Sequence, residues 1–524
     1  MTLISSIVPR SYRMHAMQVT SVSAFVLSAC ATPMPAQPAL ACRTTAIAPV
    51  RLTLPPGAAK IAELPACALD LPQWPAARRT IRVPAGQSVQ AAVNSAQPGD
   101  EIVLDAGATY RGAIVLPRKT GQGWITIRTS NMAALPPAGT RVRPMHASAM
   151  ARLVPGHPSE SVVRTVDGAA RWRLVGLEIT YPADVREAST LVSLGSADLG
   201  EQRTLAAVAA DLVLERVYVH GTPQTSFRRC IALNSARTII VDSHISDCHG
   251  TATQSQAIGG WNGPGPYRIE NNYIEASSQP VFFGGSDPSI RDLVPSDIEI
   301  RRNHFFVPRA WAGKWVIFAQ LEFKNAARVL VEGNVFDYEG HQNFSQLWKS
   351  VNQDGGAPWS VTKDVTFRYN VIRGAGSGIN VAGRPESQPA IPAHRITIVH
   401  NVVETVGRIN VMLADADDVL LASNSFTGGD MGVVLNGRPM QRLTILRNTF
   451  DATGQQFRSD EGLGNVALQH HAARGFTIDG NVFFGGDERN LPPGSVTPPR
   501  GSLPGRAGAN RMAVDSATRG VVLR

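Results

Sequence analysis

The sequence predicts an all-β solenoid, a parallel β-helix, and three observations lead to this prediction. A short pattern recurs, in which an apolar residue lies three positions before an asparagine and another lies two positions after it. Apolar periodicity of three to four residues, which helical repeats require, is absent. The 47 glycines and 36 prolines among 524 residues favour many turns over long helices. The pattern centres on Asn272, Asn303, Asn334, Asn370, Asn401, Asn424, Asn448 and Asn481, at intervals of 23 to 36 residues.

The recurrent asparagine suits a turn between two strands of such a coil. Asparagine tolerates a left-handed backbone, and its amide can bond to the copy in the next coil. Weaker copies of the pattern, centred on Leu177, Val217 and Ser243, extend it toward the N-terminus. We therefore expect a ladder of stacked asparagines along the solenoid.

A second row of residues follows each asparagine. Its first and third places are mostly apolar and should face the core, which leaves the second and fourth places facing outward. We align the coils as residues 231–234, 257–260, 281–284, 321–324, 346–349, 379–382, 411–414, 433–436 and 466–469. The outward places then hold Asn234, Gly260, Gly284, Glu322, Lys324, Lys349 and Asn380.

The two ends of the solenoid are also predicted. We place the β-helix at residues 80–485, with a short amphipathic helix at 88–96 that covers its exposed N-terminal end. Strands at 101–104 and 124–128 should begin the coils. The last segment, 486–524, should be an irregular tail.

The segments before the solenoid differ in composition. Residues 1–29 hold two arginines, no acidic residue and an apolar stretch, which predicts an export signal. The sequence Leu27-Ser28-Ala29-Cys30 resembles the bacterial lipobox, so lipid attachment at Cys30 and plain cleavage nearby both stay open. Residues 31–78 are rich in Pro and Ala and predict a linker along the domain surface. We expect a periplasmic, outer-membrane or extracellular protein.

Four cysteines follow the predicted signal, and an even number in an exported protein permits disulfides. Proximity in the sequence pairs Cys42 with Cys67 and Cys230 with Cys248. Buried free thiols remain the alternative for the second pair.

The charge balance narrows the partners. The 50 Lys and Arg against 41 Asp and Glu give a net charge of +9, which favours polyanions. No dense Lys/Arg run and no nucleic-acid-binding motif occurs, so we do not expect nucleic acid as a partner, and charge alone does not choose among the other polyanions, such as an anionic lipid or an acidic polysaccharide. No apolar run reaches about 18 residues, so a membrane contact would come only through lipid at Cys30. We expect a monomer.

The outward row brings together candidate catalytic residues. Lys324 and Lys349 should stack at the coil spacing of about 4.8 Å, where their charges repel and lower one pKa. A lysine with a lowered pKa can act as a base, while its partner binds a carboxylate or donates a proton. Gly260 and Gly284 would leave a groove beside them. Solvated ion pairs between Glu322 and the lysines are the alternative.

Other residues are candidates for substrate binding. We assign Asn380, Asn234 and Arg373 to polar contacts, and Trp261, in a turn-rich loop, to stacking on a sugar. Arg228 and Arg229 either extend a cationic track or are simply solvated. A glycosidase needs two placed carboxylates, and Asp417-Asp418 is the only adjacent Asp pair, which makes hydrolysis a lesser alternative. A non-catalytic carbohydrate-binding or surface scaffold is the main rival to an enzyme.

Residues 83–110 resemble the opening of many bacterial right-handed β-helix proteins, among them the polysaccharide lyases related to chondroitinase B and alginate lyase. The segment Leu321-Glu322-Phe323-Lys324-Asn325 is similar to the segment that carries the catalytic lysine of these lyases. The resemblance implies a right-handed β-helix and β-elimination on a uronate polysaccharide with Lys324 as base.

The chain departs from the family beside this lysine. Lys349 stands where the family has an arginine, and Glu322 alone stands for an acidic pair. Calcium, which neutralises the substrate carboxylate in the family, is therefore left open, with Lys349 or Arg373 as the alternative neutraliser.

Overall fold

The computed structural model describes residues 39–43, 47–196, 201–252, 254–383 and 388–500, and the backbone of 512–514 and 521–523. The predicted export signal and Cys30 lie outside these residues and stay predictions. Across the described ranges, no helix combines the length and hydropathy needed to cross a bilayer.

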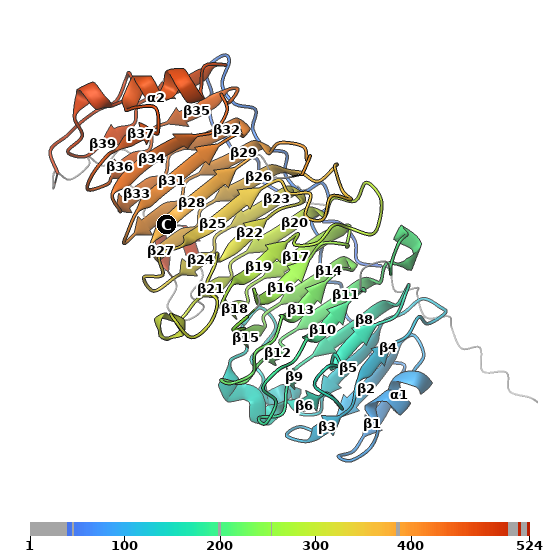
Figure 1. Ribbon diagram of the computed structural model, residues 1–524. Helices are drawn as coiled ribbons and strands as arrows, with labels where there is room; N and C mark the ends of the chain where they lie inside the picture. Colours follow the sequence, from blue (N-terminus) through green and yellow to red (C-terminus); the bar gives the residue numbers. More distant parts are fainter. Residues whose placement is uncertain are drawn as a thin grey trace, which may run out of the picture. The chain divides into compact units, whose positions relative to one another are not determined.

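The described chain forms a right-handed parallel β-helix, as predicted. Each coil adds one strand to each of three parallel sheets, which we call the 14-, 13- and 12-stranded sheets (Figure 1). The 14-stranded sheet contains β1 (Arg79–Val83), β2 (Asp100–Leu104), β5 (Ile125–Thr129), β8 (Ala170–Val175), β11 (Ala210–Glu215), β14 (Ala236–Val241), β17 (Gly265–Glu270), β20 (Ser296–Arg301), β23 (Ala326–Glu332), β26 (Thr362–Arg368), β29 (His394–Val399), β32 (Asp417–Ala422), β35 (Leu443–Leu446) and β38 (Phe476–Asp479). The 13-stranded sheet contains β3 (Thr109–Arg111), β6 (Ala151–Val154), β9 (Leu177–Thr180), β12 (Tyr218–His220), β15 (His244–Cys248), β18 (Tyr273–Ala276), β21 (His304–Phe306), β24 (Val335–Asp337), β27 (Val371–Ala375), β30 (Val402–Thr405), β33 (Ser425–Gly428), β36 (Thr449–Asp451) and β39 (Val482–Phe483). The 12-stranded sheet contains β4 (Ile114–Leu116), β7 (Val163–Thr165), β10 (Thr190–Leu194), β13 (Arg229–Leu233), β16 (Gln256–Gly260), β19 (Gln279–Phe283), β22 (Leu321–Phe323), β25 (Phe344–Lys349), β28 (Ser377–Ala382), β31 (Ile409–Ala414), β34 (Met431–Asn436) and β37 (Phe457–Ser459).

Short elements complete the chain. The helix α1 (Val89–Ser95) covers the N-terminal end, with Ser88 as its N-cap, which confirms the predicted capping helix. In the tail, β40 (Met512–Val514) and β41 (Val521–Leu523) form an antiparallel pair. Turns of 3₁₀ helix lie in the connections, at η1 (Met132–Ala134), η2 (Pro144–Ala149), η3 (Leu205–Ala207), η4 (Arg309–Trp311) and η5 (Glu488–Asn490).

The predicted asparagine ladder is confirmed. The backbone N–H and the amide of Asn303 both donate to Oδ1 of Asn334, at 2.9 and 3.1 Å. The amide of Asn303 also donates to the carbonyl of Ile269 at 2.9 Å. The same bonds recur from Asn272 through Asn448. Each buried bond contributes on the order of 1 kcal/mol, so the ladder fixes the register of the coils.

The interior of the solenoid is filled by stacked apolar side chains. Phe305 and Phe336 stack with their ring centroids 4.3 Å apart, and Phe450 stacks between Phe426 and Phe483 at 4.9 Å. All five rings are fully buried. Burying each such ring stabilises the fold by about 1.5–3 kcal/mol. One cluster of buried apolar side chains extends from Val83 to Leu491.

One predicted strand is wrong. Residues 466–469 belong to the helix α2 (Gly464–His471), and the strand that pairs with β34 is β37. Ala467 and Leu468 are fully buried and pack onto the last coils. The apolar spacing of 466–469 also fits a helix, and here the open end of the solenoid requires a cover.

The segment at 47–78, together with residues 39–43, forms a strap along the 14-stranded sheet. Its backbone N–H groups donate to side chains on successive coils: Leu40 to Asp211, Ala59 to Thr444, Lys60 to Asp418, Ala62 to Thr397, Glu63 to Asp364 and Ala66 to Asp297. The strap therefore runs out from β11 to β35 and returns, as the blue trace in Figure 1 shows. The predicted disulfide between Cys42 and Cys67 closes this excursion, and Cys230 bonds to Cys248 in the core.

Candidate functional site

The two predicted lysines lie side by side on the outer face of the 12-stranded sheet. Strand pairing aligns Phe323 of β22 with Trp348 of β25, so Lys324 and Lys349 follow at the same place in neighbouring coils. Both are half-buried. The sheet thus brings two ammonium groups together as the sequence alignment predicted.

Glu322 lies beneath the lysines and is fully buried. Its Oε1 lies 3.6 Å from Nζ of Lys349, and its Oε2 accepts a 2.8 Å hydrogen bond from the amide of Gln279. The carboxylate is therefore engaged on both oxygens, with one amide and one cation.

Lys324 has a different environment from Lys349. Its Nζ donates to Oε1 of Gln353 at 2.9 Å and lies 5.4 Å from the centre of the Phe282 ring. Burial lowers the pKa of Lys324 below its usual 10.5; Glu322 opposes this shift and the charge of Lys349 adds to it. A side chain at Gly284 would lie 2.6 Å from Cβ of Lys324. Lys324 therefore packs directly against the buried Gly284, so its side chain fills the space in which the sequence predicted a groove.

The predicted position of Gly260 is wrong. Ile258, and not Ala257, pairs with Ile231 and Val281, so the coil is shifted by one residue. Gly260 then lies in the inward row, where a Cβ would be 2.2 Å from the carbonyl of Leu233. The run Ala257-Ile258 offers two apolar residues for one inward place, and the larger one takes the place between its two neighbours.

The same shift puts Trp261 at the outward fourth place, yet this ring is not open to solvent. Only 4% of Trp261 is exposed, and the guanidinium of Arg229 lies 4.5 Å from the ring centre. Asn234 is fully buried, and its Oδ1 accepts from the N–H groups of Trp261 and Asn262. Both residues therefore shape the loop after β16.

The remaining two predicted residues lie apart from each other. Asn380 of β28 pairs with Leu347 and continues the row of Glu322; among the described residues its buried Oδ1 has no hydrogen-bond partner. Arg373 lies on the 13-stranded sheet, where it donates to both oxygens of Asp337 at 2.6 and 2.9 Å. The structure does not bring Arg373 to the lysines.

A row of amides leads from the lysines toward β13, and the sequence analysis missed it. The amide of Gln256 donates to Gln279 at 3.1 Å, and Gln279 donates to Glu322. Arg229, Gln256 and Gln279 pair with one another across β13, β16 and β19. Glutamine two residues before the apolar place in two neighbouring coils was the available signal.

The residues beside Lys324 do not fit a calcium site. Calcium takes six to eight oxygen ligands, several of them carboxylates, and Glu322 is already engaged with Lys349 and Gln279. Two further acids lie near Lys324, and both are engaged in a turn: Asp287 accepts from the backbone N–H groups of Gln353, Asp354 and Gly356, and Asp354 accepts from the N–H of Asp287. No group of three or more His, Cys, Asp or Glu suited to a metal occurs in the described ranges.

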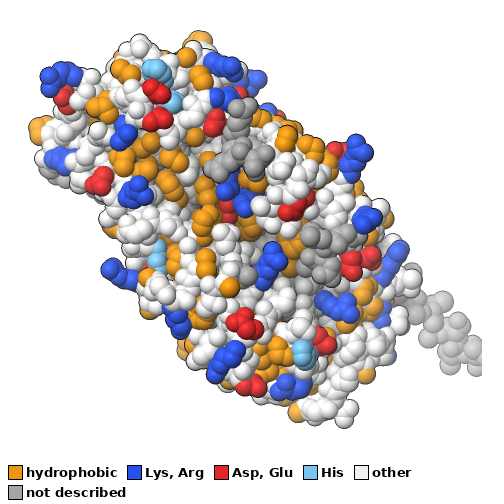
Figure 2. Space-filling model, viewed as in Figure 1, with side chains coloured by type: hydrophobic (Ala, Val, Ile, Leu, Met, Phe, Trp, Pro, Cys, Tyr) orange, Lys and Arg blue, Asp and Glu red, His pale blue; other side chains and the backbone are white. Residues whose placement is uncertain are grey.

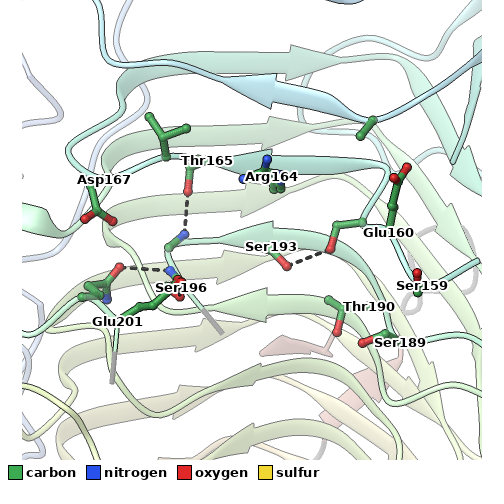
Figure 3. Close-up of a pocket in the computed structure, with 15 residues that line it drawn as sticks. Ser159, Glu160, Arg164, Thr165, Asp167, Ser189, Thr190, Ser193, Ser196 and Glu201 are labelled. Carbon is green, nitrogen blue, oxygen red and sulfur yellow. Dashed lines mark hydrogen bonds between the residues drawn. The ribbon is translucent and has the colours of Figure 1, made fainter. Parts of the chain in front are cut away.

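A cavity of about 840 Å³ lies farther along the same sheet, over β7 and β10 (Figure 3). Its lining is rich in hydroxyl groups, and Ser161 and Ser193 bond to each other at 3.0 Å across it. Glu160, Arg164 and Glu201 supply charge. Hydroxyl and charged groups of this kind suit a polar ligand such as a sugar chain.

Comparisons with known proteins bear on the fold. No family model matches the chain, and no curated protein does. Among solved structures, the surface adhesin PfbA of Streptococcus pneumoniae is 16% identical over 70% of this chain and 86% of its own, with a TM-score of 0.44. The PL6 family alginate lyase AlyGC is 12% identical over 84% of this chain and 56% of its own, with a TM-score of 0.43. Both likenesses are remote, and it is the pairing of the strands in three parallel sheets that establishes the β-helix.

Proposed function

We propose that the outer face of the 12-stranded sheet binds an acidic polysaccharide and cleaves it by β-elimination at Lys324. The observation that carries this proposal is the pair of stacked lysines, of which one is driven toward its neutral form. A neutral amine and an ammonium group one coil apart are what the reaction needs.

The step assigns one task to each lysine. The neutral amine of Lys324 takes the proton from the carbon next to the uronate carboxylate, whose charge Lys349 offsets. The electron pair forms a carbon–carbon double bond, the bond to the glycosidic oxygen breaks, and that oxygen takes a proton from water. Asn380, in the row of Glu322, is placed to bond a sugar hydroxyl.

Binding without cleavage is the second candidate function, and one observation favours it. Both lysines already have partners: Lys349 lies 3.6 Å from Glu322, and Lys324 donates to Gln353. Such pairs are typical of a charged surface that takes no part in chemistry. A surface of this kind would hold the polysaccharide and leave its bonds intact.

Ultraviolet absorbance separates the two candidates. The purified chain is incubated with alginate, pectate, glycosaminoglycans and bacterial uronate polymers, because elimination creates an unsaturated uronate that absorbs. We expect absorbance to rise on one polymer and to stay flat with Lys324→Ala. Loss of general base catalysis slows a reaction by about 10²–10⁴-fold.

Two controls make this result decisive. Lys60, an exposed lysine on the strap, provides Lys60→Ala, which should cleave at the wild-type rate. Circular dichroism should show that Lys324→Ala keeps its β-sheet. Equal turnover by Lys324→Ala and wild type would exclude the assigned base, and binding without any absorbance change would favour the scaffold.

A further inference from the structure

Arg229 of β13 is a buried cation without a matching anion. Only 5% of the residue is exposed, and its Nε is fully buried. Throughout the described ranges, no carboxylate or other acceptor takes a hydrogen bond from its guanidinium. Burial, with a smaller effect from Arg228, lowers the pKa of Arg229 to about 9.

The fold builds a slot for this side chain on the outer face of the 12-stranded sheet. The guanidinium lies against the ring of Trp261, 4.5 Å from its centre. A Cβ at Gly259 would lie 3.3 Å from Nε, and Gly259 pairs with Ala232, another small residue. The missing side chain at Gly259 leaves room for the planar group, and the ring of Trp261 lies against it.

The slot offsets only part of the cost of burying the charge. A desolvated cation–π contact recovers less free energy than the burial of an unpaired ion costs. Beside it, Oε1 of Gln256 is buried and has no partner among the described residues. One amide oxygen does not replace a carboxylate, so the site lacks an anion.

We propose that Arg229 is a carboxylate subsite that binds a second uronate of the acidic polysaccharide, away from the cleaved bond. This inference rests on the substrate class of the proposed function and not on the elimination step. A planar guanidinium matches a carboxylate with two parallel hydrogen bonds, which a neutral sugar does not offer.

The position of Arg229 fits an extended ligand. Three coil steps separate β13 from β22, or about 14 Å at about 4.8 Å each. The amides of Gln256 and Gln279 lie between Arg229 and Glu322 on the same face. A bound chain would thus contact a cation at each end of a polar row.

The test measures affinity and stability together for Arg229→Met, Arg229→Lys and the matched control Arg228→Met, in which the neighbouring exposed arginine is changed. Affinity electrophoresis through gels that contain alginate, pectate or hyaluronan gives the dissociation constants, and circular dichroism gives the melting temperatures. We expect Arg229→Met to weaken binding about 10-fold or more, as for a lost charge-assisted hydrogen bond. Arg229→Lys should weaken binding less, and Arg228→Met should change it less than 2-fold.

Stability gives the second readout. An apolar residue that replaces an uncompensated charge should leave the melting temperature unchanged or raise it. Wild-type affinity in Arg229→Met would overturn the proposed subsite and leave the proposed function intact. A melting temperature far below that of wild type, or a failure to fold, would also overturn the subsite, because Arg229 would then be needed for the fold. A wild-type chain that binds none of the polymers would overturn both proposals.

Discussion

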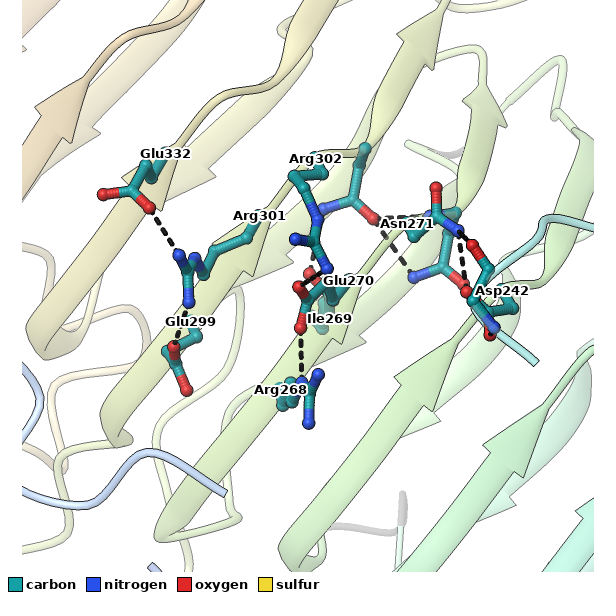
Figure 4. Close-up of polar contacts among 12 residues, drawn as sticks. Asp242, Arg268, Ile269, Glu270, Asn271, Glu299, Arg301, Arg302 and Glu332 are labelled. Carbon is teal, nitrogen blue, oxygen red and sulfur yellow. Dashed lines mark hydrogen bonds and ion pairs between the residues drawn. The ribbon is translucent and has the colours of Figure 1, made fainter. Parts of the chain in front are cut away.

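The outer faces of the 14-stranded and 12-stranded sheets differ in how their charged side chains are paired. On the 14-stranded sheet, aspartate and arginine alternate from coil to coil and pair with each other. The pairs are Asp211–Arg237, Asp297–Arg328, Asp364–Arg395 and Asp418–Arg442. A second row is also paired, since Glu332 binds Arg301 and Arg368, and Glu270 binds Arg268 and Arg302. Figure 4 shows Glu332 with Arg301 and Glu270 with Arg268 and Arg302.

The strap uses the same carboxylates. Asp211, Asp297, Asp364 and Asp418 each accept a backbone N–H from the strap as well as an arginine. A carboxylate has about four lone-pair sites, so it can serve both partners. The strap thus covers this row, in which each of the four aspartates is paired with an arginine.

The 12-stranded sheet has more cations than anions between β13 and β25. Glu322 is paired with Lys349, and the charges of Glu322 and Asp354 act on Lys324, whereas Arg229 has no carboxylate partner among the described residues. Native folds rarely leave buried polar groups unmatched without a reason. One face thus pairs these charges within the fold, whereas the other keeps cations that, under the proposed function, an anion of the ligand would meet. Figure 2 shows how the charged side chains are scattered over one side of the molecule.

The largest stability loss should follow Glu332→Ala on the 14-stranded face. The change leaves Arg368, which is 6% exposed at its side chain, and Arg301 without this carboxylate. Breaking such a pair costs about 3–5 kcal/mol. The urea midpoint measures this loss of stability. The control is Glu404→Ala, which changes an exposed acid and should keep the free energy of unfolding within about 0.5 kcal/mol of wild type. A similar small change at Glu332 would contradict the structural role of this face.

Removing the strap disulfide should have the next largest effect. In Cys42→Ser/Cys67→Ser the cross-link over 25 residues is lost, which costs about 3 kcal/mol in the chain-entropy account. Hydrogen exchange should accelerate at Ala59, Lys60 and Ala62, whose N–H groups bond to the sheet. Polysaccharide affinity should stay the same, because the strap lies on the other face. A parallel loss of affinity would show that the two faces are coupled.

Glu322→Gln should have a smaller effect on stability and the opposite effect on binding. The glutamine can still accept from Gln279, and Lys349, which is 28% exposed, can reach solvent. We expect a stability change of about 1 kcal/mol or less and an affinity for acidic polysaccharide raised about 2–5-fold. Affinity electrophoresis measures the change in affinity. Weaker binding would mean that Glu322 orients Lys349 for the ligand.

Much of the solenoid could be predicted because an asparagine recurs once in most of its coils. The asparagine positions fixed the coils, and the apolar places beside them aligned Lys324 with Lys349 correctly. The alignment failed at Gly260, where Ala257 and Ile258 both fit the inward place, and the partners Ile231 and Val281 decided between them.

Contacts between distant segments could not be predicted from the sequence. The strap is held by aspartates some 170 to 360 positions away in the sequence, and no local sequence pattern predicts these hydrogen bonds. The burial of Arg229 depends on Gly259 and Trp261 of the next coil, whose register was the one misjudged. The chemical type of a single residue could be assigned from the sequence, whereas its hydrogen-bond and ion-pair partners could be assigned only from the folded structure.

The smallest expected effect is a shift in the titration of Lys324. Burial lowers its pKa below 10.5, Glu322 opposes that and Lys349 reinforces it. Lys349→Met should therefore raise the pKa of Lys324, and Glu322→Gln should lower it further. The rate at which an acylating reagent labels Lys324, followed against pH by mass spectrometry, measures both shifts, with exposed Lys60 of the strap as the internal reference.

The sign of the stability change follows from the same shift. Between the lowered pKa of Lys324 and 10.5, the unfolded chain holds a proton that the folded chain has released. Stability should therefore rise with pH across that window, and Lys324→Met should flatten the rise. Equal labelling curves for Lys324 in wild type and in Lys349→Met would mean that the stacked ammonium groups do not influence each other. The 12-stranded face would then lose its main electrostatic distinction from the paired face opposite.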